Sequence, residues 1–501
     1  MADLFDSVKS IWTKYPVAFG ACVYGLIAAL YGIFTNGLMP DDAYIFIQYA
    51  ENLTKTGMLA FNPGEESYGI TSLTWTLLLA LCSYLPIALE TMSKALGILL
   101  SSIGVAFWAK WAFDRTDIPA SPLPLIIAAL IPTIGPGRMI VGMEPPLLCL
   151  LSGILVYSYG RRAIPVMGVS GGLLILTRPD MSIVVFVLFT ILAFRQRIRQ
   201  AIIFAGLAGI IALPWHAWLY YRIGHILPPT RVGKLAVFLP DHLNITLSQF
   251  ESGTIVNHLI WSVSALKAFA KIGFSSLAFL GLVTAAILVS LFMIYRRKSS
   301  TLEILLLPTA CIISSLAAYC VLFPLLKLRY FVWISPALII GIWLAGRTLF
   351  NAKLFHRLSL IAVCGFLLLL YPALKRQIYS TEMVKYRLRT GIWLSQNTPP
   401  DARIALEPIG QIGYASHRYI VDMGGLTNTE TQPYIVNGFA DTTRILQCLA
   451  DFSADYLVTY DHDGYLGALI RDCPDHFEQV AYIPEQPVEN LRYRVVRIIK
   501  K

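Results

Sequence analysis

Long apolar stretches separated by short polar connections recur along the chain up to about residue 375. A helix needs about 20 apolar residues to cross the hydrocarbon core of a bilayer, so stretches of roughly this length indicate membrane spans. The stretch 122–141 contains Pro132, Gly135, Pro136 and Gly137, which indicates a broken or re-entrant helix buried in protein. The candidate spans are 16–36, 72–89, 92–112, 122–141, 145–160, 163–176, 181–194, 201–221, 272–295, 302–324, 331–348 and 358–374.

This pattern predicts a polytopic α-helical membrane protein with about eleven spans. If the segment 41–71 and Glu144 both lie on the outer face, the chain must cross the membrane an even number of times between them. However, 72–89, 92–112 and 122–141 are three candidates. Either one of these three stretches does not span, or Glu144 lies inside.

Composition and charge placement support the membrane interpretation and give it a direction. The chain is 56% hydrophobic and only 14% charged, which excludes a soluble protein of 501 residues. A net charge of +10 would suggest a nucleic-acid partner in a soluble protein, but here the basic residues cluster in short connections. By the positive-inside rule these connections are cytoplasmic, and no nucleic-acid partner is expected. They are Arg161-Arg162, Arg195/Arg197/Arg199, Arg296-Arg297-Lys298 and Lys353/Arg357.

The same rule puts the amino terminus in the cytoplasm and gathers the remaining polar segments on the outer face of what we interpret as a bacterial plasma (inner) membrane. These are the loop 37–71, the turn 177–180, the loop 222–270, the turn 327–330 and everything after 375. We therefore divide the chain into a membrane domain, 1–375, and an outer domain, 376–501.

The outer domain alternates charged residues with short apolar runs, which indicates a small α/β domain. Strands are expected at 403–406, 419–421, 455–459 and 492–496, and helices at 385–395 and 441–452. Cys448 and Cys473 fall in this domain, where an oxidising setting permits a disulfide. The sequence does not give their separation, so their pairing stays open.

The stretch 41–75 has more chemical variety than its apolar surroundings. Asp41 and Asp42 follow Pro40 where the first span should leave the lipid, and carboxylates there are costly unless they are used or solvated. Residues 41–49 predict a helix lying in the membrane interface, and 62–65, Asn-Pro-Gly-Glu, predict a turn.

These residues carry a resemblance. The segment DDAYIFIQYAENL, followed by FNPGE and YGITSLTW, resembles the first outer loop of GT-C fold membrane glycosyltransferases. Within them it is most similar to the mycobacterial terminal arabinofuranosyltransferases that use decaprenyl-phosphoryl arabinose. The chain departs from that branch at Gln48, at Pro145-Pro146 and at Pro228-Pro229-Thr230, so the sugar and the acceptor stay open. Later fragments agree in order: Gly142-Met143-Glu144, Leu176–Asp180, Lys234, Leu328–Tyr330, Glu407–Tyr414 and the run VDMGGLTN at 421–428.

The resemblance implies transfer of a sugar, with inversion, from a polyprenyl monophosphate to an envelope glycan, lipid or protein. The attacking hydroxyl then needs a base, for which Asp41 and Asp42 are the candidates. The alternative is that both cap the interfacial helix. A divalent cation such as Mg, Mn or Ca is the one cofactor considered, and it too would be held by Asp41 and Asp42.

The leaving phosphate needs positive charge. Arg178, Lys234 and Arg329 are outer-face cations expected to bind it, with Tyr330 as a hydrogen-bond donor, although basic residues and tyrosines near span ends also anchor proteins at the interface. Expected in the substrate cavity are Glu144, Asp180, Tyr44, Glu407 and Gln411. An ion pair with Arg178 is the favoured role for Asp180.

Other functions were weighed. A transporter or flippase should show inverted repeats and charges at mid-membrane, whereas here the charges gather at one face and no repeat is evident. A silent scaffold binding a lipid-linked sugar would not need the Asp pair. A transferase that modifies pilin-like proteins remains a variant within the same fold.

Overall fold

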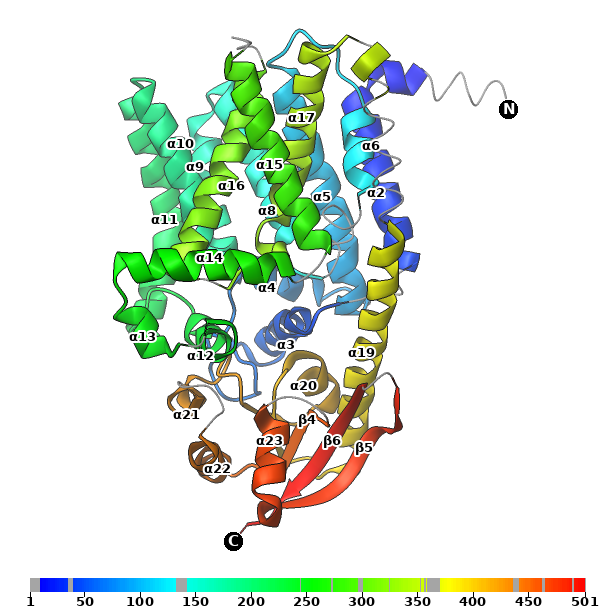
Figure 1. Ribbon diagram of the computed structural model, residues 1–501, viewed down its shortest axis with the longest axis vertical. Helices are drawn as coiled ribbons and strands as arrows, with labels where there is room; N and C mark the ends of the chain where they lie inside the picture. Colours follow the sequence, from blue (N-terminus) through cyan, green and yellow to red (C-terminus); the bar gives the residue numbers. More distant parts are fainter. Residues whose placement is uncertain are drawn as a thin grey trace, which may run out of the picture.

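The computed structural model has a helical membrane domain stacked on a small α/β domain, with a layer of short helices between them (Figure 1). The carboxyl terminus lies at the far end of the α/β domain. The structure describes residues 10–34, 39–131, 142–243, 245–271, 274–295, 301–323, 325–351, 353–355, 357, 370–435, 441–461, 465–488 and 491–500.

Upright helices form the membrane domain (Figure 1). Among the described residues, six helical segments are long and apolar enough to cross a membrane: Pro16–Ile33, Leu89–Phe113, Ile198–Ile223, Ser276–Tyr295, Leu302–Leu322 and Val332–Leu349. The helices are α2 (Pro16–Phe34), α4 (Leu73–Cys82), α5 (Leu89–Phe113), α6 (Leu123–Ala129), α8 (Pro145–Arg161), α9 (Ile164–Thr177), α10 (Ser182–Phe194), α11 (Ile198–Ile223), α15 (Phe274–Tyr295), α16 (Leu302–Leu322) and α17 (Ser335–Leu349), with 3-10 turns η1 (Pro179–Met181), η2 (Leu328–Tyr330) and η3 (Val332–Ile334).

The predicted stretch 72–89 is not one continuous span. It ends as a helix at Cys82, and α5 begins only at Leu89. At 1.5 Å per residue α4 is about 15 Å long, half of the roughly 30 Å hydrocarbon core. The first part of the predicted broken helix 122–141 is α6, and its remainder, 132–141, lies outside the described residues. So does the candidate span 358–374 up to residue 369. The count of about eleven spans therefore stays a prediction.

Four helices from the two predicted outer loops lie below the membrane helices (Figure 1). Helix α3 (Asp41–Thr56) is the predicted interfacial helix and continues about two turns further than expected. It is followed by Gly57, whose φ of 72° suits a residue without Cβ. Helix α14 runs across the end of the bundle with exposed leucines and isoleucines, as expected of a helix at a lipid interface. The loop 222–270 folds into α12 (Thr230–Leu243), α13 (Leu247–Glu251) and α14 (Ile255–Lys271).

The outer domain is a five-stranded sheet of order β2-β1-β4-β6-β5. The first three neighbours are parallel, and β6 and β5 are added antiparallel. All four predicted strands are confirmed, whereas β5 and the helix at 410–416 were not predicted. The elements are α19 (Leu370–Asn397), β1 (Arg403–Leu406), α20 (Gly410–Ser416), β2 (Tyr419–Asp422), η4 (Thr429–Thr431), α21 (Gln432–Ile435), α22 (Thr442–Asp451), β4 (Tyr456–Tyr460), α23 (Tyr465–Asp472), η5 (Pro474–His476), β5 (Phe477–Val488) and β6 (Leu491–Ile498).

Successive residues of a strand point to opposite faces of the sheet, so the side chains of the strands pack into two different cores. Ile404 and Leu406 pack with Ile412 and Leu394 in the core that is shared with the membrane domain. Ala405 packs with Ile445, Cys448 and other residues of α22 and α23 in a second core. Cys448 and Cys473 are both free thiols, so the disulfide that the sequence left open does not form in this structure.

The outer domain is attached to the membrane domain through polar contacts and close backbone approaches. Asn62, in the predicted turn, exchanges two hydrogen bonds with the backbone of Ile420, at 2.9 Å each. A Cβ at Gly69 would lie 2.4 Å from the carbonyl oxygen of Leu426, and one at Gly233 would lie 2.4 Å from that of Gly424. The VDMGGLTN run therefore fits against both outer loops.

We predict that Gly233→Ala loosens this attachment. The added methyl group overlaps a backbone oxygen that cannot move alone, and overpacking of this kind costs about 1–3 kcal/mol. Gly206→Ala is the matched control, because both positions are helical and a Cβ at Gly206 meets nothing within 4 Å. Thermal unfolding and limited proteolysis of the purified proteins should show a lower melting temperature and faster release of the outer domain for Gly233→Ala only. Equal behaviour of the two variants would contradict the tight fit.

Candidate active site

Asp41, the first residue of α3, connects the two domains. Its Oδ2 and Oδ1 accept hydrogen bonds from the backbone N–H groups of Gly410 and Gln411, both at 2.8 Å, so it caps the start of α20. The Arg387 guanidinium from α19 lies 3.9 Å from Oδ1. Burial raises the pKa of Asp41, and Arg387 and the two N–H groups oppose that rise. Both carboxylate oxygens of Asp41 are therefore engaged by the outer domain.

Asp42 faces a different set of partners. Its Oδ2 forms an ion pair with the guanidinium of Arg329 from η2, and Nζ of Lys234 from α12 lies 3.6 Å away. Burial alone would raise the pKa of Asp42, but Arg329, Lys234 and Lys327 hold it well below its usual range. Because consecutive helical residues point about 100° apart, the adjacent aspartates serve separate sites.

Positive charge exceeds negative charge around Asp42. Lys327 is a residue that we did not single out from the sequence. Its side chain makes no hydrogen bond or ion pair among the described residues, and burial lowers its pKa. Nε of Arg329 is buried without a hydrogen-bond partner in the described part of the chain. Such an unused buried donor is rare in folded proteins and suits an incoming acceptor. We call Lys234, Lys327 and Arg329 the cation cluster.

Tyr330 lies directly beside the cation cluster. Burial alone would raise its pKa, but Lys234, Arg329, Lys327 and Arg178 lower it to about 8. The Arg329 guanidinium carbon lies 5.4 Å from the centre of the Tyr330 ring, and the role of Tyr330 as a hydrogen-bond donor to phosphate stays a prediction.

Arg178 is buried among protein partners. It donates to Glu144 at 2.9 Å and to Asp180 at 3.0 Å, and it also bonds Tyr319. Its guanidinium carbon lies 4.2 Å from the centre of the Tyr330 ring. The predicted ion pair with Asp180 is confirmed, and Glu144 pairs with the same arginine. Each guanidinium nitrogen of Arg178 thus has a protein partner, and its role in binding the donor phosphate stays a prediction.

The remaining predicted cavity residues separate into two groups. Tyr44 packs its ring 5.4 Å from that of Tyr414, and the Gln411 amide donates to the Met39 carbonyl at 2.8 Å, so both hold α3 against α20. Glu407, by contrast, directly follows β1. Its side chain reaches solvent, but the surrounding protein still removes much of its hydration. Burial, Asp41 and Asp422 raise its pKa to about 7. Its nearness to Asp41, Arg387 and Lys327 places it at the edge of the same centre.

Asp422 and Arg387 also shape the site, and sequence reasoning gave neither a role. Asp422 accepts hydrogen bonds from the backbone of Gly424, Leu426 and Thr427 at 2.6–2.9 Å, and so folds the VDMGGLTN loop. Arg387 reaches Asp41 from a helix far along the chain. The Asp-x-Gly-Gly pattern in the sequence could have indicated the loop-forming role of Asp422. Nothing near Arg387 in the sequence indicates that it contacts Asp41.

The Asp pair does not fit the metal-binding role that we considered. Asp41 uses both oxygens on N–H donors, and Asp42 faces three cations, which would repel a divalent ion. Among the described residues, no group of three or more His, Cys, Asp or Glu side chains is arranged to hold a metal ion.

Comparison with solved structures identifies the fold. The crystal structure of ArnT from Cupriavidus metallidurans bound to undecaprenyl phosphate aligns with 95% of this chain and 97% of that one, with a TM-score of 0.55 and 12% identity. The apo structure of the same protein gives a TM-score of 0.54 with the same identity and coverage. The predicted GT-C fold is thereby confirmed. These structures give no support for the arabinofuranosyltransferase branch in particular.

The sequence was also compared with protein-family models and with curated proteins. Residues 376–497 match the model of a domain of unknown function, DUF8728. A comparison with curated proteins gives no match.

We predict that Asp41→Ala destabilises the protein. It leaves two buried N–H groups of α20 without an acceptor, and each such group costs about 1–3 kcal/mol. Thermal unfolding of the purified full-length protein should show a clear drop, and Asp41→Asn, which keeps one acceptor oxygen, should fall between Asp41→Ala and wild type. A stable Asp41→Ala protein would show that the cap contributes little.

Glu407 gives a pH-dependent prediction. Because its pKa is raised from 4.5 to about 7 in the folded protein, the folded state favours the protonated carboxyl. Its stabilising contribution is present below pH 4.5 and is lost as the pH rises to about 7. Glu407→Gln cannot ionise and so does not lose stability as the pH rises. The melting temperature of Glu407→Gln minus that of wild type should therefore be larger at pH 8 than at pH 4.5. Glu478→Gln, at an exposed position on β5, controls for the loss of one charge.

Proposed function

We propose that this protein is an inverting glycosyltransferase that moves a sugar from a polyprenyl monophosphate to an acceptor hydroxyl on the outer face of a bacterial plasma membrane. The observation that carries the proposal is the cation cluster. Three cations from two separate segments meet around one carboxylate and leave an excess of positive charge. A phosphate group neutralises that excess and accepts hydrogen bonds from Arg and Lys.

The fold supports the same class of donor. The solved structure with this fold holds undecaprenyl phosphate, a polyprenyl monophosphate, although 12% identity carries no residue assignments from one chain to the other. Arabinofuranose is the sugar we would test first because of the resemblance of the 41–75 segment. The proposed acceptor is an envelope glycan, lipid or protein.

In the proposed reaction, an oxygen of the acceptor hydroxyl forms a bond to the anomeric carbon as the bond from that carbon to the phosphate oxygen breaks. The bonding electron pair leaves with the polyprenyl phosphate, whose added charge is stabilised by Lys234, Lys327 and Arg329. The hydroxyl proton goes to the carboxylate of Asp42. The donor phosphate competes with Asp42 for Arg329 and Lys234, which makes Asp42 a stronger base once the donor is bound.

Other residues contribute by positioning Tyr330 and Asp42. Arg178, anchored by Glu144 and Asp180, positions Tyr330 beside the phosphate site. Asp41 fixes the start of α3, and thereby Asp42, relative to the outer domain. Asp41 is accordingly a positioning residue in this proposal.

The test is transfer of radiolabelled sugar from synthetic polyprenyl phosphates, arabinofuranose first and then hexoses, by full-length protein in native membranes. Asp42→Asn should lower turnover by about 10²–10⁴-fold, the usual contribution of a general base. Lys327→Met should weaken phosphate binding, whereas Lys267→Met, at an exposed position on α14, should not.

Binding separates the two roles. Undecaprenyl phosphate should stabilise Asp42→Asn against heat at least as much as wild type, since that variant frees Arg329 and Lys234. If Asp42→Asn transfers sugar normally while Glu407→Gln does not, the base is Glu407. Movement of the intact donor across the membrane without transfer would establish a flippase instead.

A further inference from the structure

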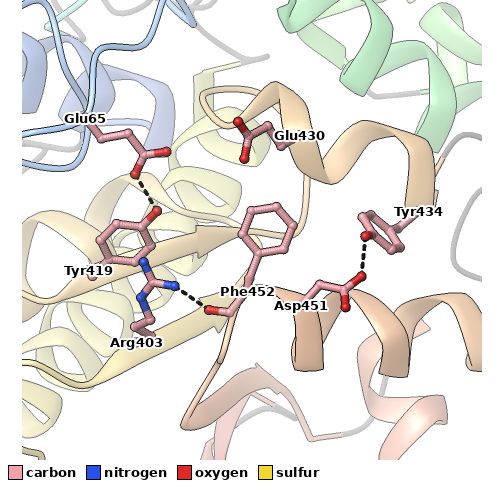
Figure 2. A pocket seen from close by; sticks show the side chains of 7 residues that line it. All are labelled: Glu65, Arg403, Tyr419, Glu430, Tyr434, Asp451 and Phe452. Carbon is pink, nitrogen blue, oxygen red and sulfur yellow. Dashed lines mark hydrogen bonds between the residues drawn. The ribbon is translucent and has the colours of Figure 1, made fainter.

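A second cavity, of about 560 Å³, lies at the junction of the two domains and takes no part in the mechanism above. Five segments build it: the loop before α4, the starts of β1 and β2, the stretch from η4 to α21, and the end of α22 (Figure 2). The outer domain supplies most of its lining, and Glu65 of the membrane domain completes it. Its lining residues are Glu65, Arg403, Tyr419, Glu430, Tyr434, Asp451 and Phe452.

Three aromatic rings are distributed along this cavity. Tyr419 lies at one end and Tyr434 at the other, and the Phe452 ring projects between them (Figure 2). The Arg403 guanidinium stacks on the Tyr419 ring at 4.1 Å and donates to the Phe452 carbonyl at 2.7 Å, so the rings are held in place. Tyr434 and Phe452 make an edge-to-face contact at 6.3 Å. Fixed flat rings are suited to the C–H faces of sugar rings.

Three carboxylates line the same cavity. Glu65 accepts from the Tyr419 hydroxyl, and Asp451 accepts from the Tyr434 hydroxyl. Glu430 is exposed, and its carboxylate makes no hydrogen bond or ion pair among the described residues. Carboxylate oxygens have spare acceptor capacity, so they can take hydrogen bonds from hydroxyl donors. The cavity has three carboxylates and one guanidinium, so its net negative charge repels an anionic ligand. Uncharged ligands that carry many hydroxyl groups fit it best.

The cavity lies away from the reacting centre along β1. Arg403 begins that strand and Glu407 follows its end, and at about 3.3 Å per residue the two α-carbons are roughly 13 Å apart. One sugar unit does not span that separation, whereas a short chain of sugars does.

We propose that this cavity binds a neutral oligosaccharide and holds the part of an acceptor glycan that is remote from the transfer point. The binding claim stands on the cavity, whereas the word acceptor rests on the proposed function. The site would select a glycan acceptor over a lipid or protein, and would favour chains over single sugars.

The test is direct binding of the purified full-length protein in nanodiscs to an array of neutral arabinofuranose, mannose and galactofuranose oligosaccharides, from mono- to hexasaccharides, with uronic-acid oligosaccharides beside them. Wild type should bind at least one neutral oligosaccharide more tightly than its monosaccharide and than the anionic ones. Tyr434→Ala should bind it about tenfold more weakly, as expected from losing one aromatic contact. Glu430→Gln, at an exposed position that should not disturb folding, should also bind more weakly.

Matched controls are Tyr482→Ala and Glu478→Gln on β5, outside the cavity, which should bind as wild type does. Absence of binding to every neutral oligosaccharide, a preference for anionic ones, or unchanged binding by Glu430→Gln would overturn the inference. Because binding needs neither donor nor turnover, glycan binding without sugar transfer would overturn the proposed function alone. Transfer to long acceptors that is unaffected by Tyr434→Ala and Glu430→Gln would overturn this inference alone.

Discussion

The repulsion among Lys234, Lys327 and Arg329 is the constraint around which the outer half of this protein is arranged. These cations come from α12 and from the turn that ends at η2, and they are brought together in a partly buried place at the edge of the membrane domain. Asp42 is the carboxylate that forms ion pairs with two of them in the described part of the chain. Holding like charges together costs free energy that folding elsewhere must supply, and that cost is usual at sites that receive a charged ligand.

The position of Asp42 depends in turn on its neighbour. Asp41 is tied to the N–H groups of α20, so the first turn of α3 is anchored to the outer domain, while Asp42 in the same turn is paired with Arg329 of the membrane domain. Arg387, which reaches the same carboxylate from α19, adds a second tie from the outer domain. Asp42 is therefore held from both sides: α12 and η2 supply its cationic partners, and the outer domain fixes its neighbour Asp41.

The outer domain presents the two ends of its parallel strands to different tasks. Glu407 follows β1 close to Lys327 and Asp422, and Asp422 ends β2, whereas Arg403 and Tyr419 begin the same strands and line the second cavity. In our proposals, this short sheet brings the reacting centre and the oligosaccharide site within reach of one extended ligand. The VDMGGLTN loop links the two ends, since it starts at Asp422 and leads into Glu430 and Tyr434.

Much of this protein was determined by the sequence alone. Apolar length, charge placement and strand alternation predicted the membrane class, four strands of the outer domain, the interfacial helix and the Arg178–Asp180 ion pair. The resemblance of the 41–75 segment implied the GT-C fold. These features depend on residues close together in the chain. The tertiary structure alone decided that Asp41 caps a helix 369 residues further on, while Asp42 meets the cations. It also revealed Lys327, Arg387 and the unpredicted α20. Their roles arise from contacts between distant segments, and no local periodicity encodes which segments will meet.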